Sequence, residues 1–138
     1  MVDALREARR VLTSRGVLID IRPVTAPMVV EVLIAARAIW AKEVDACSTP
    51  EDIAGADAAV QHALSGEWFA FEKNHTFDLE IYCDTAADLS LYAQTRKLRE
   101  AAIPYDELDS WRRELCADGQ AVRLRCRRPW MLSTYRKK

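Results

Sequence analysis

The chain has 138 residues, of which 50% are apolar and 30% charged, with only four Gly and five Pro. This composition predicts one soluble globular domain over residues 1–138. Lys and Arg total 20 against 21 Asp and Glu, a formal charge of -1, so long-range attraction to nucleic acid or an anionic membrane is not expected. No apolar run reaches the roughly 18 residues of a membrane-spanning helix and none resembles a signal peptide, so we expect a cytoplasmic protein.

The first segment predicts an amphipathic helix followed by a buried strand. One face of the helix is formed by apolar residues spaced by three or four, namely Val2, Leu5, Ala8, Val11 and Leu12. The helix ends at Ser14-Arg15-Gly16. The run Val17-Leu18-Ile19 then begins a strand, Gly16–Arg22, that ends in polar residues. Open α/β sheets bind ligands at the carboxyl ends of strands, so Asp20 and Arg22 are candidates to face a substrate. A surface or capping role is the alternative.

The segment Thr25–Ala46 is predicted to be one long helix. Thr25 can cap it, Pro27 suits its first turn, and the run from Val29 to Trp40 is broken only by Glu31 and Arg37. Such a helix is apolar nearly all round and should be covered on more than one side. A second helix is expected to begin at Thr49-Pro50-Glu51-Asp52, with a hydroxyl cap and early acids, and to end at Gly66.

The second half of the chain predicts two more strands and two more helices. Strict alternation predicts a strand over Phe77–Cys83, preceded by a turn or kink at Lys73-Asn74-His75. Asp84 or Thr85 can cap the next helix, with Asp88 at capping-box distance, and Pro104 opens a short helix through Leu115. Asp118-Gly119 turns the chain into the last strand, Gln120–Arg128, which continues past Pro129 to Tyr135.

The C-terminal stretch is basic, and two interpretations of it differ. Its cations could contact phosphates while Trp130 and Tyr135 stack on bases. However, alternation places Arg123, Arg125 and Arg127 on one face of the last strand. Asp78 and Glu80 share the solvent-exposed face of the strand Phe77–Cys83. Cross-strand charge pairing then accounts for most of the basic run, so we do not expect nucleic acid as a partner.

Neither the cysteines nor the histidines form a recognisable site. The four cysteines, Cys47, Cys83, Cys116 and Cys126, show no C-x-x-C spacing, and we expect them to be buried thiols. Cys83 and Cys126 are candidates for the core. His62 and His75 have no nucleophile at a recognisable spacing and are expected to be structural. Four aromatic residues could line a ligand pocket, but a place in the core is the commoner role: Trp68, Phe69, Phe71 and Phe77.

The first helix and strand resemble a known family. Residues 4–12 (ALREARRVL), Ser14-Arg15-Gly16 and Val17-Leu18-Ile19-Asp20 resemble the EA-x-RVL-x-PGG-x-L-x-x-D stretch of class I S-adenosylmethionine-dependent methyltransferases. In that family the stretch is the helix before the fifth strand, a tight turn and the strand itself. The elements that follow are also similar in order to the C-terminal half of such an enzyme.

The resemblance implies a Rossmann-like α/β or α+β fold with three layers. Its small mixed sheet would have about three strands, Gly16–Arg22, Phe77–Cys83 and Gln120–Arg128, with the last strand between the other two and antiparallel to them. The family's cofactor-binding residues precede the fifth strand and have no counterpart here. The glycines are far apart, so no Gly-rich cradle is formed: Gly16, Gly55, Gly66 and Gly119. We therefore assign no catalytic, cofactor-binding or metal residue.

Two functions follow from this resemblance. The first is a methyltransferase-like domain that is non-catalytic on its own and forms a homodimer or binds a partner. An unpaired apolar edge at Val17-Leu18-Ile19 and the apolar helix Thr25–Ala46 both favour self-assembly. The second is the C-terminal half of a split methyltransferase, in which S-adenosylmethionine binds only when a separate chain supplies the cofactor half.

Overall fold

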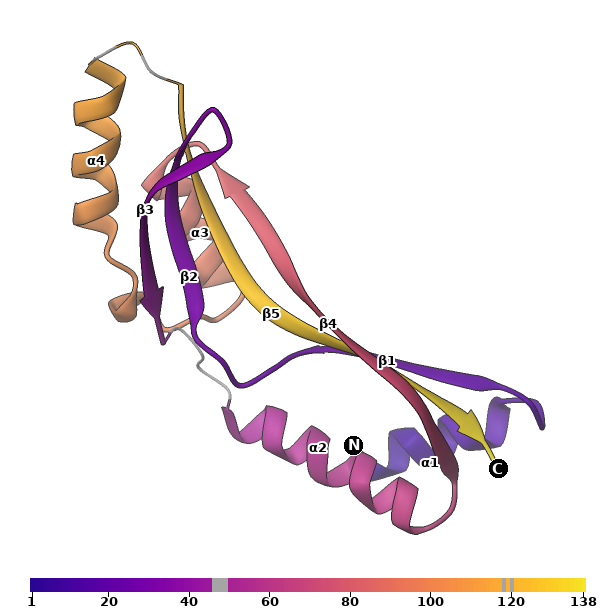
Figure 1. Cartoon of the computed structure of the whole chain (residues 1–138). Helices are drawn as coiled ribbons and strands as arrows, with labels where there is room; N and C mark the ends of the chain where they lie inside the picture. The colour runs from indigo at the N-terminus through magenta and orange to yellow at the C-terminus, as the bar shows by residue number, and fades with distance from the viewer. Residues whose placement is uncertain (46–49, 118, 120) are drawn as a thin grey trace. The chain divides into compact units, whose positions relative to one another are not determined.

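The computed structural model describes residues 1–45, 50–117, 119 and 121–138. Its helices and strands occur in the following order along the chain: α1 (Val2–Val11), β1 (Val17–Pro23), β2 (Met28–Ile34), β3 (Arg37–Val44), α2 (Pro50–Ser65), β4 (Phe69–Cys83), α3 (Ala86–Thr95), a 3-10 turn (Glu100–Ala102), α4 (Tyr105–Ala117) and β5 (Val122–Lys137) (Figure 1). Several predicted features lie outside the described residues: the helix end at Ala46, Cys47, the Thr49 cap, Asp118 and the strand start at Gln120.

In the described part of the chain, five strands form one antiparallel sheet in the order β1-β5-β2-β3, with β4 also paired to β5. The prediction that the last strand lies between the strands at Gly16–Arg22 and Phe77–Cys83 is confirmed, because β5 pairs with both β1 and β4. The expected number of about three strands is wrong. A mixed sheet is also wrong, because neighbouring strands run antiparallel.

The contacts divide the chain into two compact units. Unit 1 contains 1–25, 49–77 and 129–138, and unit 2 contains 26–48 and 78–128. The long strands β4 and β5 therefore contribute residues to both units.

In unit 1, α1 and α2 contact each other and pack on one face of the strands (Figure 1). Val60 and Ala63 of α2 are buried together with Phe69 and Tyr135, and apolar side chains from α1 and β1 pack against them: Leu5, Leu12 and Leu18. The backbone of Gly16 lies close to the side chain of Leu12, since a Cβ at position 16 would lie 2.8 Å from the Leu12 Cβ. A small residue is therefore required where α1 turns back onto β1.

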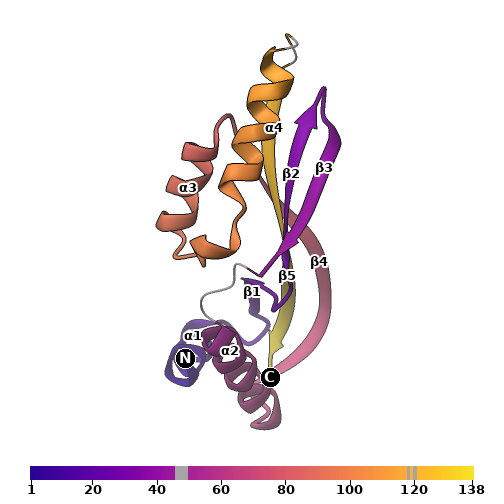
Figure 2. The ribbon, with the colours of Figure 1, turned by 90° about the vertical axis from the view of Figure 1, so that its left-hand side faces the viewer.

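In unit 2, α3 and α4 lie on the same side of β2 and β3, as Figure 2 shows. Val30 and Val32 of β2, Leu124 of β5, Leu89 of α3 and Leu108 of α4 are each no more than 1% exposed and belong to one apolar cluster. Each unit thus has one layer of helices on one face of its strands, and the predicted three-layer arrangement is found in neither.

The predicted helix Thr25–Ala46 is wrong, because this segment contains the hairpin of β2 and β3. Ile34 pairs with Arg37, so the connection consists of Ala35 and Ala36, whose φ angles are 47° and 66°. Positive φ at both central residues is the signature of a type I′ hairpin turn, which Asn-Gly normally marks. Two alanines carry no such signal. Val30, Val32 and Leu33 of β2 are buried within unit 2, so an apolar helix surface no longer argues for a dimer.

The other helices agree with the local sequence signals. α3 begins at the predicted capping box, in which the Thr85 Oγ1 accepts from the Asp88 N–H at 3.1 Å and the Thr85 N–H donates to the Asp88 carboxylate at 3.0 Å. The acidic first turn of α2 is also as predicted, and α4 begins directly after Pro104 as expected. These signals act over three or four residues and therefore do not depend on tertiary contacts.

Three smaller predictions are corrected. Lys73-Asn74-His75 forms no turn but lies within the continuous strand β4, where these residues are exposed. Cys83 and Cys126 are buried as expected, whereas Cys116 is exposed. Among the aromatic residues Phe69 is buried, but Phe71 is 53% exposed and does not belong to the core.

Candidate functional site

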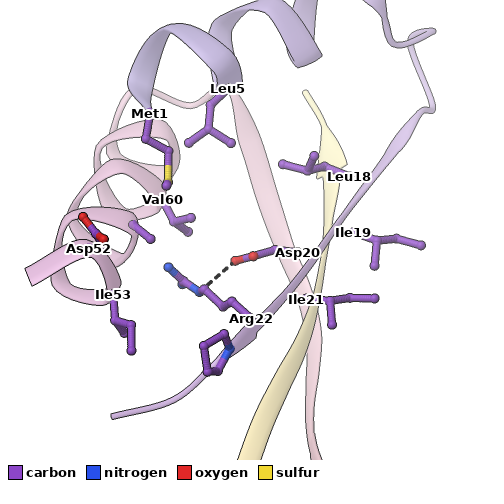
Figure 3. Close-up of a pocket in the computed structure, with 12 residues that line it drawn as sticks. Met1, Leu5, Leu18, Ile19, Asp20, Ile21, Arg22, Asp52, Ile53 and Val60 are labelled. Atoms are coloured by element: carbon purple, nitrogen blue, oxygen red, sulfur yellow. Dashed lines mark ion pairs between the residues drawn. The ribbon is translucent and has the colours of Figure 1, made fainter. Parts of the chain in front are cut away.

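The side chains of β1 alternate between two environments, so this strand divides into an inner and an outer face. Leu18, Asp20 and Arg22 point toward α1 and α2, whereas Ile19 and Ile21 point away from them (Figure 3). The continuous run Val17-Leu18-Ile19 is therefore not buried as a whole, because Val17 is 38% and Ile19 58% exposed.

A cavity of about 420 Å³ lies in unit 1 beside β1 (Figure 3). Its walls are largely apolar and come from α1, α2 and β1, while Asp20, Arg22 and Asp52 are the charged side chains that line it. The apolar lining residues are Met1, Leu5, Leu18, Ile19, Ile21, Pro23, Ile53, Ala56 and Val60. Both residues predicted to face a substrate thus line one cavity, whose volume is within the range of roughly 300–1,000 Å³ seen for small-molecule sites.

Arg22 forms ion pairs with two carboxylates. Its Nε lies 3.2 Å from the Asp20 Oδ2, and its second terminal nitrogen lies 2.8 Å from the Asp57 Oδ1. The Arg22 side chain is only 12% exposed and that of Asp20 21%, whereas Asp57 is 58% exposed. The arginine therefore bridges a half-buried and an exposed carboxylate.

Asp57 was missed by the sequence analysis. It lies on α2 one turn after Ile53 and close to Val60, so it interrupts the apolar face of that helix. A carboxylate on an apolar helix face is the available signal, but its partner lies 35 positions earlier in the sequence. Only the packing of α2 near β1 shows that the two charges meet.

The environment of Asp20 disfavours its charged form. Burial raises the pKa of this carboxyl, the Arg22 charge lowers it, and the Asp57 charge raises it again, with a net pKa above the ordinary value. The Asp20 Oδ2 is buried and accepts no hydrogen bond from the described residues, and one terminal nitrogen of Arg22 is likewise buried without a hydrogen-bond partner there.

A smaller cavity of about 240 Å³ is also lined by Arg22 and Asp57. Its other walls are more polar and include Gln61, Asn74 and Ser133. Arg22 therefore borders two cavities in unit 1, and Asp57 borders the smaller one.

The two histidines make aromatic contacts rather than catalytic ones. The ring of His62 meets Trp68 edge-on at 5.5 Å, and that of His75 stacks on Phe77 at 6.4 Å between centroids. Over the described ranges, no group of three or more His, Cys, Asp or Glu side chains could hold a metal ion. The ring contacts of His62 and His75 agree with the structural role expected for both residues.

The basic C-terminal strand pairs with acidic residues as predicted, but with a further partner. Arg125 contacts Glu80 at 3.3 Å and Arg127 contacts Asp78 at 2.9 Å, while both arginines also bind Glu31. Glu31 is 3% exposed and lies on β2, where the sequence analysis had expected a helix. Arg123 instead pairs with Asp84 at 3.2 Å.

The outer edge of β1 is open. The Gly16 carbonyl accepts from the Lys137 N–H at 3.0 Å and the Val24 N–H donates to the Pro129 carbonyl at 3.2 Å, at the two ends of the β1–β5 ladder. Antiparallel ladders alternate, so the N–H and C=O groups of Val17, Ile19 and Ile21 point away from β5. No strand pairs with them among the described residues.

Comparisons with known proteins give no further assignment. The chain matches no protein-family model, no curated protein and no solved structure. None of the helices described is long and apolar enough to cross a membrane.

Proposed function

We propose that this chain is a methyltransferase-like domain, non-catalytic on its own, that forms a homodimer through the open edge of β1. The observation that carries the proposal is that the same residues at this edge have backbone groups without a strand partner and apolar side chains exposed to solvent. The residues whose N–H and C=O groups point outward, Val17, Ile19 and Ile21, are also 38%, 58% and 52% exposed. Apolar, uncharged edges of this kind are usually paired or covered.

The edge is self-complementary about a two-fold axis. If the Ile19 residues of two copies face each other, Val17 of each copy faces Ile21 of the other, and all outward backbone groups form antiparallel pairs. In this register Asp20 faces Leu18, so no like charges are opposed. The other long edge, β4, presents Glu72 and Lys73, which are both exposed and discourage such pairing.

The order of elements supports the methyltransferase resemblance. α1 and β1 cover the similar stretch, α2 corresponds to the helix after the family's fifth strand, and β5 pairs between β1 and β4. The hairpin β2–β3 is an addition to that pattern. The site for S-adenosylmethionine does not fit this chain, because Gly16, Gly55, Gly66 and Gly119 are far apart and form no glycine-rich turn that could seat the cofactor. No reaction step is therefore assigned to that cofactor.

The homodimer is tested by replacing Ile19 with lysine. We expect wild-type protein to show twice the 15.7 kDa mass of one chain in light scattering at micromolar concentration. Ile19→Lys should give the mass of one chain, because a lysine on an edge strand blocks pairing while its exposed position leaves the fold intact.

Leu91→Lys is the matched control, because Leu91 is 65% exposed but lies on α3. This variant should remain a dimer, and circular dichroism should show that both variants are folded. A wild-type protein with the mass of one stable, soluble chain would contradict the proposal. Loss of the dimer in both variants alike would contradict the assignment of the interface to β1.

A second candidate is the C-terminal half of a split S-adenosylmethionine-dependent methyltransferase. It is favoured by the cavity that Asp20 and Arg22 line beside β1, where a substrate would be held. In this case the open edge of β1 pairs with a strand of the chain that supplies the cofactor half.

Calorimetric titration tests the non-catalytic assignment, and co-expression with a cofactor-binding chain separates the two candidates. We expect the purified chain to show no micromolar binding of S-adenosylmethionine or S-adenosylhomocysteine, because no glycine-rich turn seats the cofactor. Micromolar binding by the chain alone would contradict the non-catalytic assignment. Aggregation of the chain alone, cured by co-expression with a cofactor-binding chain, would favour the split enzyme.

A further inference from the structure

The charges on the cavity beside β1 are unbalanced. Arg22 supplies one positive charge, but it is shared between Asp20 and Asp57, at 3.2 and 2.8 Å. Asp52 lines the same cavity. The side chains around its polar end therefore carry more negative than positive charge, and an anionic ligand would meet an arginine whose charge is already neutralised.

The Asp20 carboxylate is short of hydrogen-bond donors at one of its two oxygens. Its Oδ2 receives no hydrogen bond from the described residues, although the Arg22 Nε lies 3.2 Å away. The carboxylate points into the cavity between Leu5, Val60 and Arg22 (Figure 3). The Asp20 side chain is 21% exposed. A carboxylate that is partly desolvated and short of donors is stabilised when a ligand N–H reaches it.

The remaining walls select the body of the ligand. Leu5, Leu18 and Val60 lie above Asp20 in Figure 3, and Ile53 also lines the cavity. A volume of about 420 Å³ accommodates a small ring or branched alkyl group. Burial of such a group against these side chains is favourable, whereas a polar body would lose its hydration without finding partners.

We propose that this cavity binds a small organic cation, with an apolar body between α1, α2 and β1 and a protonated amine that donates to Asp20. All residues that line the site belong to unit 1, and its charged residues Asp20 and Arg22 lie on the inner face of β1 (Figure 3). This proposal goes beyond the proposed dimer, and the two proposals have separate readouts.

The test compares probes of one shape and different charge. 2-Phenylethylamine, 2-phenylethanol and phenylacetate are titrated into the wild-type protein near neutral pH, and binding is followed by NMR chemical shifts of the backbone amides. We expect the amine to shift residues that line the cavity, with the alcohol and the carboxylate at least about tenfold weaker. Equal binding of all three probes, tighter binding of phenylacetate, or no binding of the amine would overturn the proposal.

A variant pair then locates the acceptor. Asp20→Asn keeps the shape of the side chain but removes its charge, and it should weaken the amine at least about tenfold while leaving the alcohol unchanged. Asp3→Asn is the control, because Asp3 lies on α1 with its side chain 92% exposed, and it should bind the amine like the wild type. Unchanged amine binding in a folded Asp20→Asn protein would overturn the assignment to Asp20. If that variant does not fold, the series of probes on the wild-type protein still decides the proposal.

Discussion

Replacing Glu31 with alanine is expected to lower the free energy of unfolding by about 3 kcal/mol at neutral pH, the lower end of the cost of breaking a buried ion pair. The Glu31 carboxylate accepts from the Arg125 Nε at 2.6 Å and from two nitrogens of Arg127 at 3.1 Å each. Its own side chain is 4% exposed and that of Arg125 18%. Alanine would leave a cavity beside the guanidinium groups of Arg125 and Arg127, whose remaining acidic partners would be Glu80 and Asp78.

Asp78→Ala is the matched control, because the Asp78 carboxylate accepts from Arg127 at 2.9 Å but is 44% exposed. Exposed ion pairs contribute about 0–1 kcal/mol, so this variant should unfold close to the wild type in a urea titration followed by circular dichroism. Equal losses in the two variants would contradict the claim that burial of Glu31 sets the energy of the cluster.

The same cluster predicts a loss of stability in acid. Burial raises the pKa of Glu31, but hydrogen bonds from Arg127 and Arg125 outweigh it and hold the pKa below its ordinary value. A lowered native pKa stabilises the folded state above the unfolded-chain value of about 4.3, and this contribution is lost as the pH falls through the native pKa. The difference in stability between wild type and Glu31→Gln should therefore shrink below about pH 4.

Replacing Ala36 with glycine is expected to raise the free energy of unfolding by about 0.5–1 kcal/mol. Ala36 has a φ of 66° and Ala35 a φ of 47°, a left-handed conformation that an L-alanine adopts with strain and a glycine without it. Ala35→Asn combined with Ala36→Gly gives the preferred residues of this turn and should add to the gain.

The control is the same substitution two residues later. Ala38 pairs with Leu33 inside the hairpin, so Ala38→Gly should cost about 0.5–1 kcal/mol. In a helix over this segment both glycines would be destabilising, by about 1 kcal/mol each. Urea titrations of the two variants thus distinguish a hairpin from a helix by the sign of the Ala36→Gly effect.

The sequence by itself determined the elements whose signals are local. The apolar spacing of α1, the capping box of Thr85 and Asp88, and the alternation of β5 each act within a few residues, and all three are found in the structure. The pairing of Arg125 with Glu80 and of Arg127 with Asp78 also followed from alternation, because it needs only that β4 and β5 be neighbours.

Only the tertiary structure decided the hairpin and the cavity. A segment such as β2, buried on both faces, loses its polar alternation, and its pattern cannot be told from that of a buried helix without a glycine or asparagine at the turn. Asp20 and Arg22 were candidates from their place at the end of β1, but Asp57 joined them only when α2 packed near that strand. Burial and charge pairing between distant segments depend on packing, which no local pattern encodes.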